Sequence, residues 1–305
     1  MAPTFDERVA ERTERMSPAE QRVIRFFQEN REEVLIASAA ALAAKAETSD
    51  ATIVRATKAL GFSGLDDLRR TLADELRRSL SPAERLTRTL GEVGTSLSVA
   101  FEMTLDIHVQ SLESLRRSIT SKQFENAVGS IVEARRVVVF GLGPSSAMAA
   151  YFVTQLARFG LDTTSLTNTG LLFADDLQKL RKGDLVIILA YGRVYAELAV
   201  LLDEIDRRGV ASLLLTDTLA AKLRHRVDLV LPVARGRADM LSMHTATLGL
   251  IEALLVGVAT QRPAETLSRL KELNEMRGKL AGKAMSLPVP AGHVSRPPGR
   301  SLNRG

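Results

Sequence analysis

A glycine-rich turn in the middle of the chain carries residue types that bind anions. Directly after the apolar residues 137–140 the sequence reads Gly-Leu-Gly-Pro-Ser-Ser, and a stretch of helical pattern follows. Glycines let the backbone approach a ligand closely, a helix N-terminus offers unpaired N–H groups, and serines add hydroxyl donors. The turn therefore predicts a site for a phosphate or another small anion, with Gly141, Gly143, Ser145 and Ser146 as its ligands.

The same turn departs from the dinucleotide-binding fingerprint G-x-G-x-x-G, which also places an acidic residue at the end of the second strand. Ser146 stands where the third glycine belongs, and residues 166–168 read Leu-Thr-Asn, with no Asp or Glu. The sequence thus argues against a bound dinucleotide, and no cofactor is predicted. A turn that only packs its helix against a sheet remains an open alternative.

A second group of polar residues, near the N-terminus, has the types and spacing that contact DNA. Residues 38–61 read as two short helices, the first rich in alanine, joined by a turn of a few residues. Small side chains let the helices approach closely, and the N-terminal part of the second helix would enter the major groove. We expect its exposed polar positions, Ser49, Thr52, Arg55 and Lys58, to contact phosphates and base edges. A plain helical hairpin with solvated charges is the alternative.

The elements around this second group are predicted to be helical. Serine caps a helix N-terminus and proline suits its first turn, so Ser17-Pro18, Ser38 and Ser49 each signal a helix start, and another helix follows Gly64.

Residues 81–120 are predicted to form a helical linker, with a break at residues 91–94. Its second part is a long amphipathic helix, because apolar residues recur at helical spacing. The residues on that face are Phe101, Leu105, His108, Leu112 and Leu115.

From residue 121 onward, apolar strands alternate with helices. The strand candidates are residues 137–140, 161–166, 185–190, 211–216 and 227–232. This alternation is typical of a parallel sheet that is covered by helices on both faces.

Charge and composition limit the classes of protein. The chain is +5 overall, but residues 278–305 hold five basic and no acidic side chains, so residues 1–277 sum to zero and net charge gives no support to DNA binding. Cysteine is absent, which excludes disulfides and thiolate sites, and the four histidines are scattered, so no metal site is predicted. No apolar run has the length of a membrane span or a signal peptide, so a cytoplasmic protein is expected.

The N-terminal motifs resemble a known family. Residues 48–55 read Thr-Ser-Asp-Ala-Thr-Ile-Val-Arg, and Leu-Gly-Phe-x-Gly follows at residues 60–64. Together with Ser-Pro-Ala-Glu-Gln at residues 17–21, they resemble the N-terminal domain of RpiR-type bacterial regulators. The resemblance implies a winged-helix-like or homeodomain-like DNA-binding unit whose reading helix covers residues 49–60.

The Gly-x-Gly-x-Ser turn, set among five strands, resembles the sugar isomerase (SIS) domain over residues 124–258. The resemblance implies a five-stranded parallel α/β domain that binds phosphosugars. SIS domains that grip a sugar phosphate usually carry Ser-x-Ser-Gly-x-Thr/Ser after the third strand, whereas residues 189–194 read Leu-Ala-Tyr-Gly-Arg-Val. We expect Tyr191, Gly192 and Arg193 to complete the anion site, because arginine can pair with an anion through two hydrogen bonds.

A helix-turn-helix followed by a SIS domain is the RpiR architecture. The predicted chain therefore has two domains, an all-α helix-turn-helix head and an α/β SIS-like domain with a five-stranded parallel sheet flanked by helices. The expected boundaries are a DNA-binding head at 1–80, a helical linker at 81–120, a ligand-sensing and dimerisation domain at 121–277, and a disordered basic tail at 278–305.

The predicted function is transcriptional regulation of carbohydrate or related metabolism, with DNA binding modulated by a small anionic, phosphosugar-like metabolite. The expected partners are double-stranded operator DNA, that metabolite, and further copies of the chain in a homodimer or homotetramer formed through apolar residues at 248–258, but no membrane. Catalysis is not predicted, because the candidates for the general base that an isomerase needs have commoner structural roles. Those candidates are Glu197, Glu252, His225 and His244. A phosphosugar aldose–ketose isomerase and a ligand-free dimeric DNA-binding scaffold are the alternatives, and the ligand, the operator and the sign of regulation stay open.

Overall fold

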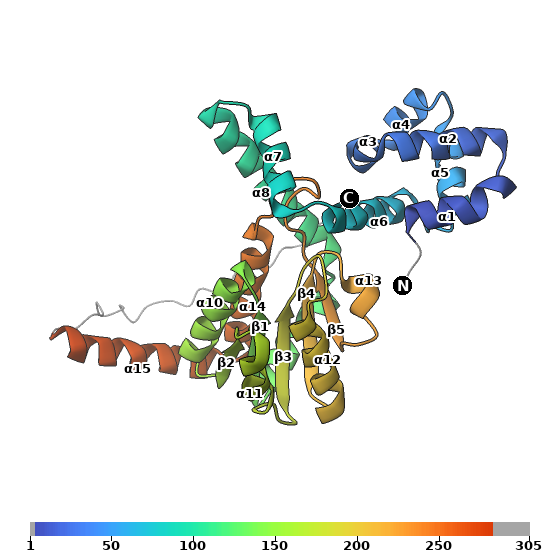
Figure 1. Cartoon of the computed structure of the whole chain (residues 1–305). Coiled ribbons are helices and arrows are strands. Elements are labelled where there is room, and N and C mark those ends of the chain that lie inside the picture. Colours follow the sequence, from blue (N-terminus) through green and yellow to red (C-terminus); the bar gives the residue numbers. More distant parts are fainter. Residues whose placement is uncertain (1–3, 283–305) are drawn as a thin grey trace, which may run out of the picture.

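The computed structural model describes residues 4–282, which form a helical head, a two-helix linker and an α/β domain (Figure 1). The head and the α/β domain lie at opposite ends of helix α6, and α7 and α8 project beside them (Figure 1). The head contains α1 (Phe5–Arg12), a 3₁₀ turn (Thr13–Arg15), α2 (Pro18–Glu29), α3 (Arg31–Ile36), α4 (Ala39–Lys45), α5 (Asp50–Ala59) and α6 (Leu65–Ser79).

Serine caps begin the helices where the sequence predicts them. The Ser17, Ser38 and Ser49 hydroxyls accept from the backbone N–H three residues later, at 3.4, 3.1 and 3.3 Å. Each of these bonds satisfies one of the N–H groups that a helix start leaves unpaired. The predicted starts of α2, α4 and α5 are confirmed.

Helices α1 and α3 were not among the elements predicted from the sequence. Helix α1 is highly charged, and only Phe5 and Val9, four residues apart on one face, are buried in the core of the head. Its start is fixed by a capping box between Thr4 and Glu7. A single inward pair in eight residues gives too little periodicity to predict such a helix from the pattern.

The linker consists of α7 (Pro82–Val93) and α8 (Leu97–Ser118). Helix α7 continues through Gly91 and ends at Gly94, which has a positive φ of 63°, so the predicted break lies at the end of its range. On α8 the predicted apolar face is only partly covered, since Phe101 and Leu105 are 62% and 43% exposed. The covered part of α8 contacts α14.

The α/β domain is built on a five-stranded parallel sheet with the order β2-β1-β3-β4-β5. The strands are β1 (Arg136–Gly141), β2 (Thr163–Leu166), β3 (Asp184–Leu189), β4 (Ala211–Thr216) and β5 (Leu229–Pro232). Alternate residues of β1 enter two separate cores, with Val137 and Val139 in one and Val138 and Phe140 in the other. The predicted sheet, covered by helices on both faces, is confirmed.

One face of the sheet is covered by α9 (Ser121–Glu133), α10 (Pro144–Arg158) and α14 (Thr245–Gln261), and the other by α11 (Phe173–Leu177), α12 (Ala196–Arg208) and α13 (Ala220–Leu223). A 3₁₀ turn (Gly170–Leu172) precedes α11, and α15 (Pro263–Ala281) extends away from the domain (Figure 1). The remainder of the predicted tail lies outside the described residues.

The apolar residues of α14 that we expected to join two copies are mostly used within the chain. Leu250, Ile251, Leu254, Leu255 and Val258 are buried in the core against the sheet. Their burial follows from the position of α14, which packs between α8, α9 and α10. Val256 of the same helix is 66% exposed, however, and it lines an open apolar groove together with Ala253 and Gly257, so the interface at residues 248–258 stays a prediction. Among the described residues, no helix is long and apolar enough to span a bilayer.

Candidate functional site

The first candidate site is the outer face of α5. Helix α5 packs on α2 and α4 through Ile53, Ala56 and the following Leu60, all fully buried. Burial of this stripe turns the opposite face outward, and it carries Arg55 and Lys58 in exposed positions. The structure thus presents a short cationic surface at one helix, held by an apolar core beneath it.

Thr52 was expected on this outer face, and that expectation is wrong. Its side chain is only 5% exposed, because residue 52 lies four positions before the buried Ala56 and so shares its face. The Thr52 hydroxyl lies 3.0 Å from the Ser49 hydroxyl and accepts a 3.0 Å hydrogen bond from the Arg55 guanidinium. Thr52 therefore holds Ser49 and Arg55 in place and does not face outward.

Helices α1 and α2 bring charged side chains close to α5. At its C-terminal end, the Arg8 guanidinium donates to the Gly61 carbonyl at 2.8 Å and lies 4.3 Å above the Phe62 ring. A cation beside the free carbonyls of a helix end is stabilising. Near its N-terminal half, Glu20 accepts hydrogen bonds from Ser17, which together with the charge of Arg55 lower its pKa.

The second candidate site is the turn between β1 and α10. A Cβ atom on Gly141 would come within 2.6 Å of the Ser145 carbonyl oxygen, so only glycine fits this close approach. Gly143 is the N-cap of α10, which begins at Pro144, three residues before the predicted helix. The Ser146 hydroxyl donates to the Gly143 carbonyl at 2.7 Å, and so it closes the turn.

A cavity of about 310 Å³ opens beside this turn, at the carboxyl ends of β1 and β3. Of the predicted ligand residues, Gly143, Ser145, Tyr191 and Arg193 line it. The other three predicted residues do not line the cavity, because they form the turns that surround it: Gly141, Ser146 and Gly192. The lining is completed by Phe140, Leu142, Pro144, Leu189, Ala190, Tyr195, Leu198, Arg235 and His244.

Arg235 and Asp217 form a buried network that sequence reasoning missed. Arg235 Nε donates to Asp217 Oδ2 at 3.1 Å, and the Asp217 side chain is fully buried. The other Asp217 oxygen accepts from the backbone N–H groups of Gly192 at 3.0 Å and Thr218 at 2.7 Å. Asp217 thereby joins the loop after β3 to the loops after β4 and β5. The sequence signal that could have identified these two residues is their position. Asp217 follows β4 and Arg235 follows β5, and ligands bind beyond the carboxyl ends of parallel strands.

Tyr191 forms the inner wall of the cavity. The Arg235 guanidinium lies 4.6 Å from the centre of its ring, and its hydroxyl lies 2.9 Å from the Thr247 hydroxyl. The His244 ring meets Tyr191 edge-on, with centroids 5.7 Å apart. Burial raises the pKa of Tyr191 above its ordinary value, so its hydroxyl stays protonated.

His244 lines the cavity as a neutral imidazole. Burial lowers its pKa, the positive charge of Arg235 lowers it further, and Asp217 opposes both. Its Nδ1 atom is buried without a hydrogen-bond partner among the described residues. The cavity is thus lined by two guanidinium groups, a buried serine and an imidazole, a set that suits an anion with further polar groups.

The other candidates for a general base lie elsewhere. Glu197 accepts from the Gly170 N–H at 3.3 Å, and Glu252 accepts from the Tyr151 hydroxyl at 3.2 Å. Neither residue lines the cavity, and no Asp or Glu is among the residues that do. His225 lines a different hollow, beside the start of β4.

Two domain families match the sequence. The helix-turn-helix domain of the rpiR family matches residues 4–79, and the SIS domain matches residues 130–257. The first match covers the head, which holds the α5 site, and the second covers the α/β domain, which holds the cavity. The chain has the domain pair of the RpiR family, an rpiR-type helix-turn-helix domain followed by a SIS domain.

Relatives of this chain cover both of its domains. It is 24% identical to the HTH-type transcriptional regulator HexR of Escherichia coli K12, over 88% of this chain and 92% of that one. It is 29% identical to the "Bifunctional protein glk" of Burkholderia orbicola over 87% of its own length, but it spans only 41% of that protein. The structure of the Vibrio vulnificus NanR protein complexed with ManNAc-6P shares the fold over 91% of this chain and 99% of that one, with a TM-score of 0.55 and 21% identity.

Proposed function

We propose that this regulator binds operator DNA through α5 in two copies, and that a small anionic metabolite of the phosphosugar type modulates the binding from the α/β domain. The observation that carries the metabolite part is Arg235, held by buried Asp217 at the wall of a cavity that Ser145 and Arg193 also line. A guanidinium at such a place can donate to an anion the hydrogen bonds that hydroxyls in the loop after β3 would otherwise have donated.

The chemistry of the cavity supports an anion that also carries sugar-like hydroxyls. Arg193 is exposed at the rim and Arg235 is mostly buried inside, so the two cations lie at different depths. His244 adds an imidazole to the lining, a group that can hydrogen-bond to a ligand hydroxyl. The NanR protein binds ManNAc-6P, a ligand with both kinds of group, which supports the same class here.

We propose that two copies associate through the exposed apolar stripe of α8. Phe101, Leu105 and Val109 recur four residues apart and are 62%, 43% and 55% exposed. The same face of α8 continues to Leu112, whose side chain packs against Gly249 of α14. Helix-turn-helix proteins read two half-sites with two heads, so a second copy is the occupant that this surface requires. Size-exclusion chromatography with light scattering should show a dimer for the wild type and monomer for Phe101→Glu.

We propose a regulator that acts in the cytoplasm without a catalytic step of its own. An isomerase moves a proton with a positioned base. Of the four candidates, only His244 lines the cavity, and no Asp or Glu lines it with His244. Incubation with aldose and ketose phosphates should therefore give no isomerised product.

Fluorescence anisotropy on DNA from upstream of the gene tests the proposal. We expect tight, sequence-specific binding that a phosphosugar shifts, in a titration with ManNAc-6P, 6-phosphogluconate, gluconate and inorganic phosphate. A shift by the phosphorylated sugars but not by phosphate alone would identify the ligand class. Weak binding that salt abolishes equally on any sequence would contradict the DNA-binding part, and specific binding that no compound shifts would favour the ligand-free scaffold.

A further inference from the structure

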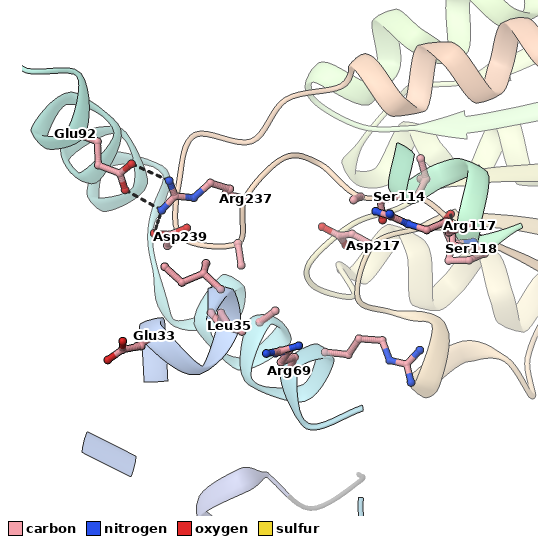
Figure 2. Close-up of a pocket in the computed structure, with 17 residues that line it drawn as sticks. Glu33, Leu35, Arg69, Glu92, Ser114, Arg117, Ser118, Asp217, Arg237 and Asp239 are labelled. Atoms are coloured by element: carbon pink, nitrogen blue, oxygen red, sulfur yellow. Dashed lines mark hydrogen bonds and ion pairs between the residues drawn. The ribbon is translucent and has the colours of Figure 1, made fainter. Parts of the chain in front are cut away.

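The loop between β5 and α14, residues 233–244, has two functional sides. On one side it places Arg235 and His244 in the wall of the cavity. On the other side it contacts the linker helices that lead to the head (Figure 2). We call this segment the strap loop.

Three hydrogen-bonded ties join the strap loop to α7. Arg237 donates two hydrogen bonds to the carboxylate of Glu92, at 2.7 and 2.8 Å, as Figure 2 shows. The Leu241 N–H donates to the Thr89 hydroxyl at 2.9 Å, and Thr89 is only 8% exposed. The third tie runs from the Arg85 guanidinium to the Ser242 hydroxyl at 3.2 Å. The three α7 residues lie on successive turns of the helix, so the loop holds it along much of its length.

Gly236 lets the two arginines point in different directions. Its φ is +77°, a conformation that other residues rarely adopt, and a Cβ there would come within 3.2 Å of Ile107 on α8. In an extended strand Arg235 and Arg237 would share one side, whereas the turn at Gly236 directs one to Asp217 and the other to Glu92. The arginine that lines the cavity and the arginine of the Glu92 tie are therefore only two residues apart in the chain.

Helix α7 is the first element after the head, since only two residues separate it from α6. A cleft of about 890 Å³ lies between the head and the α/β domain, and residues of the head, the linker and the strap loop line it. Figure 2 shows Leu35 and Arg69 of the head across this cleft from Arg237. The cleft leaves the head room to change its position when α7 shifts.

We propose that the strap loop couples the cavity to the DNA-binding head by moving α7 when Arg235 moves. This inference rests on the proposed function for its biological meaning. Independently of that function, a displacement of Arg235 should alter the stability of α7 through the Glu92 and Thr89 ties. Two sites joined in this way share a coupling free energy that either one can bias.

Hydrogen–deuterium exchange of the full chain tests the coupling without DNA or metabolite. The proteins compared are the wild type, Arg235→Gln, Glu92→Gln and the double variant, with exchange read from residues 82–93. We expect each single variant to raise exchange in α7 about fivefold, because Glu92→Gln weakens a tie of modest strength and Arg235→Gln loosens the strap loop that carries the ties. The double variant should raise exchange only slightly more than either single variant. Thr89→Val, which removes the acceptor for Leu241 N–H and keeps the shape, should have the same effect.

Glu102→Gln is the matched control, since Glu102 is an exposed glutamate on α8. It should leave exchange in α7 at the wild-type rate. Peptides from β3 report whether the α/β domain stays folded in every variant. If Arg235→Gln leaves α7 at the wild-type rate while β3 stays protected, or if the two effects multiply as independent changes do, the coupling is refuted. Failure to bind an operator or a phosphosugar would refute the proposed function and leave this result unaffected.

Discussion

Replacing Asp217 by asparagine should destabilise the α/β domain more than any exposed charge change, because Asp217 is a fully buried carboxylate that accepts hydrogen bonds from Gly192, Thr218 and Arg235. The introduced amide would still accept from the Gly192 and Thr218 N–H groups through its oxygen. Its NH₂ group would then face Arg235 Nε, so that two donors meet where a donor and a carboxylate now pair at 3.1 Å.

The size of the effect follows from the burial of the pair. Removing one partner of a buried ion pair costs about 3–5 kcal/mol, because the other charge is left uncompensated. The Arg235 side chain is 16% exposed and can turn partly toward solvent, which places Asp217→Asn near the lower end, at about 3 kcal/mol. For a domain of this size each kcal/mol lowers Tm by about 2–4 °C, so a fall of about 6–12 °C is expected.

Differential scanning calorimetry of the full chain separates the transition of the α/β domain from that of the head. The matched control is Asp203→Asn, which neutralises an aspartate that is 72% exposed and pairs with Arg226 on the surface. Its Tm should fall by no more than about 2 °C, because exposed pairs add little. A fall equally small for Asp217→Asn would show that the network around Arg235 does not hold the cavity together.

Three further changes test the two sites. Arg55→Ala should weaken operator binding by about 1–3 kcal/mol in an anisotropy titration, since a contact to a base or phosphate is lost, and light scattering should show an unchanged oligomer. Arg193→Ala should weaken phosphosugar binding about tenfold or more by calorimetric titration, because a charged hydrogen bond is removed; an unchanged affinity would remove Arg193 from the site. The lowered pKa of His244 means that the unfolded chain binds a proton more readily, so stability is full above about pH 6.5 and falls as the pH drops below it. On acidification from about pH 7.5 to about pH 5, the Tm of His244→Gln should therefore fall by less than the Tm of the wild type. An equal fall in Tm for the two proteins would contradict this role of His244.

The sequence predicted those parts of the molecule that local signals determine. Ser17, Ser38 and Ser49 mark helix starts within three residues of the groups they cap, and the apolar runs of the strands need no knowledge of distant residues. The glycine turn was also found, because the close approach of Gly141 to Ser145 is made within five residues.

The missed residues depend on contacts between distant parts of the chain. Asp217 joins Gly192 to Arg235 only because β4 lies between β3 and β5, and that strand order is not written in any local pattern. Thr52 was placed on the wrong face of its helix because the helix is amphipathic over few turns, and the packing against α2 decides which side is buried.

The arrangement of the cavity explains how a loop without phosphate-binding hydroxyls can still serve an anion. The loop after β3 brings Arg193 to the rim of the cavity, but its Tyr191 and Gly192 supply no charge. Gly192 instead donates to Asp217, and Tyr191 lies beneath the guanidinium that Asp217 orients. The second cation, Arg235, therefore comes from the loop after β5, the strap loop, which also holds α7 through Glu92. A ligand that pairs with Arg235 competes with Asp217 for the same group, and this competition gives a bound anion the means to shift the strap loop.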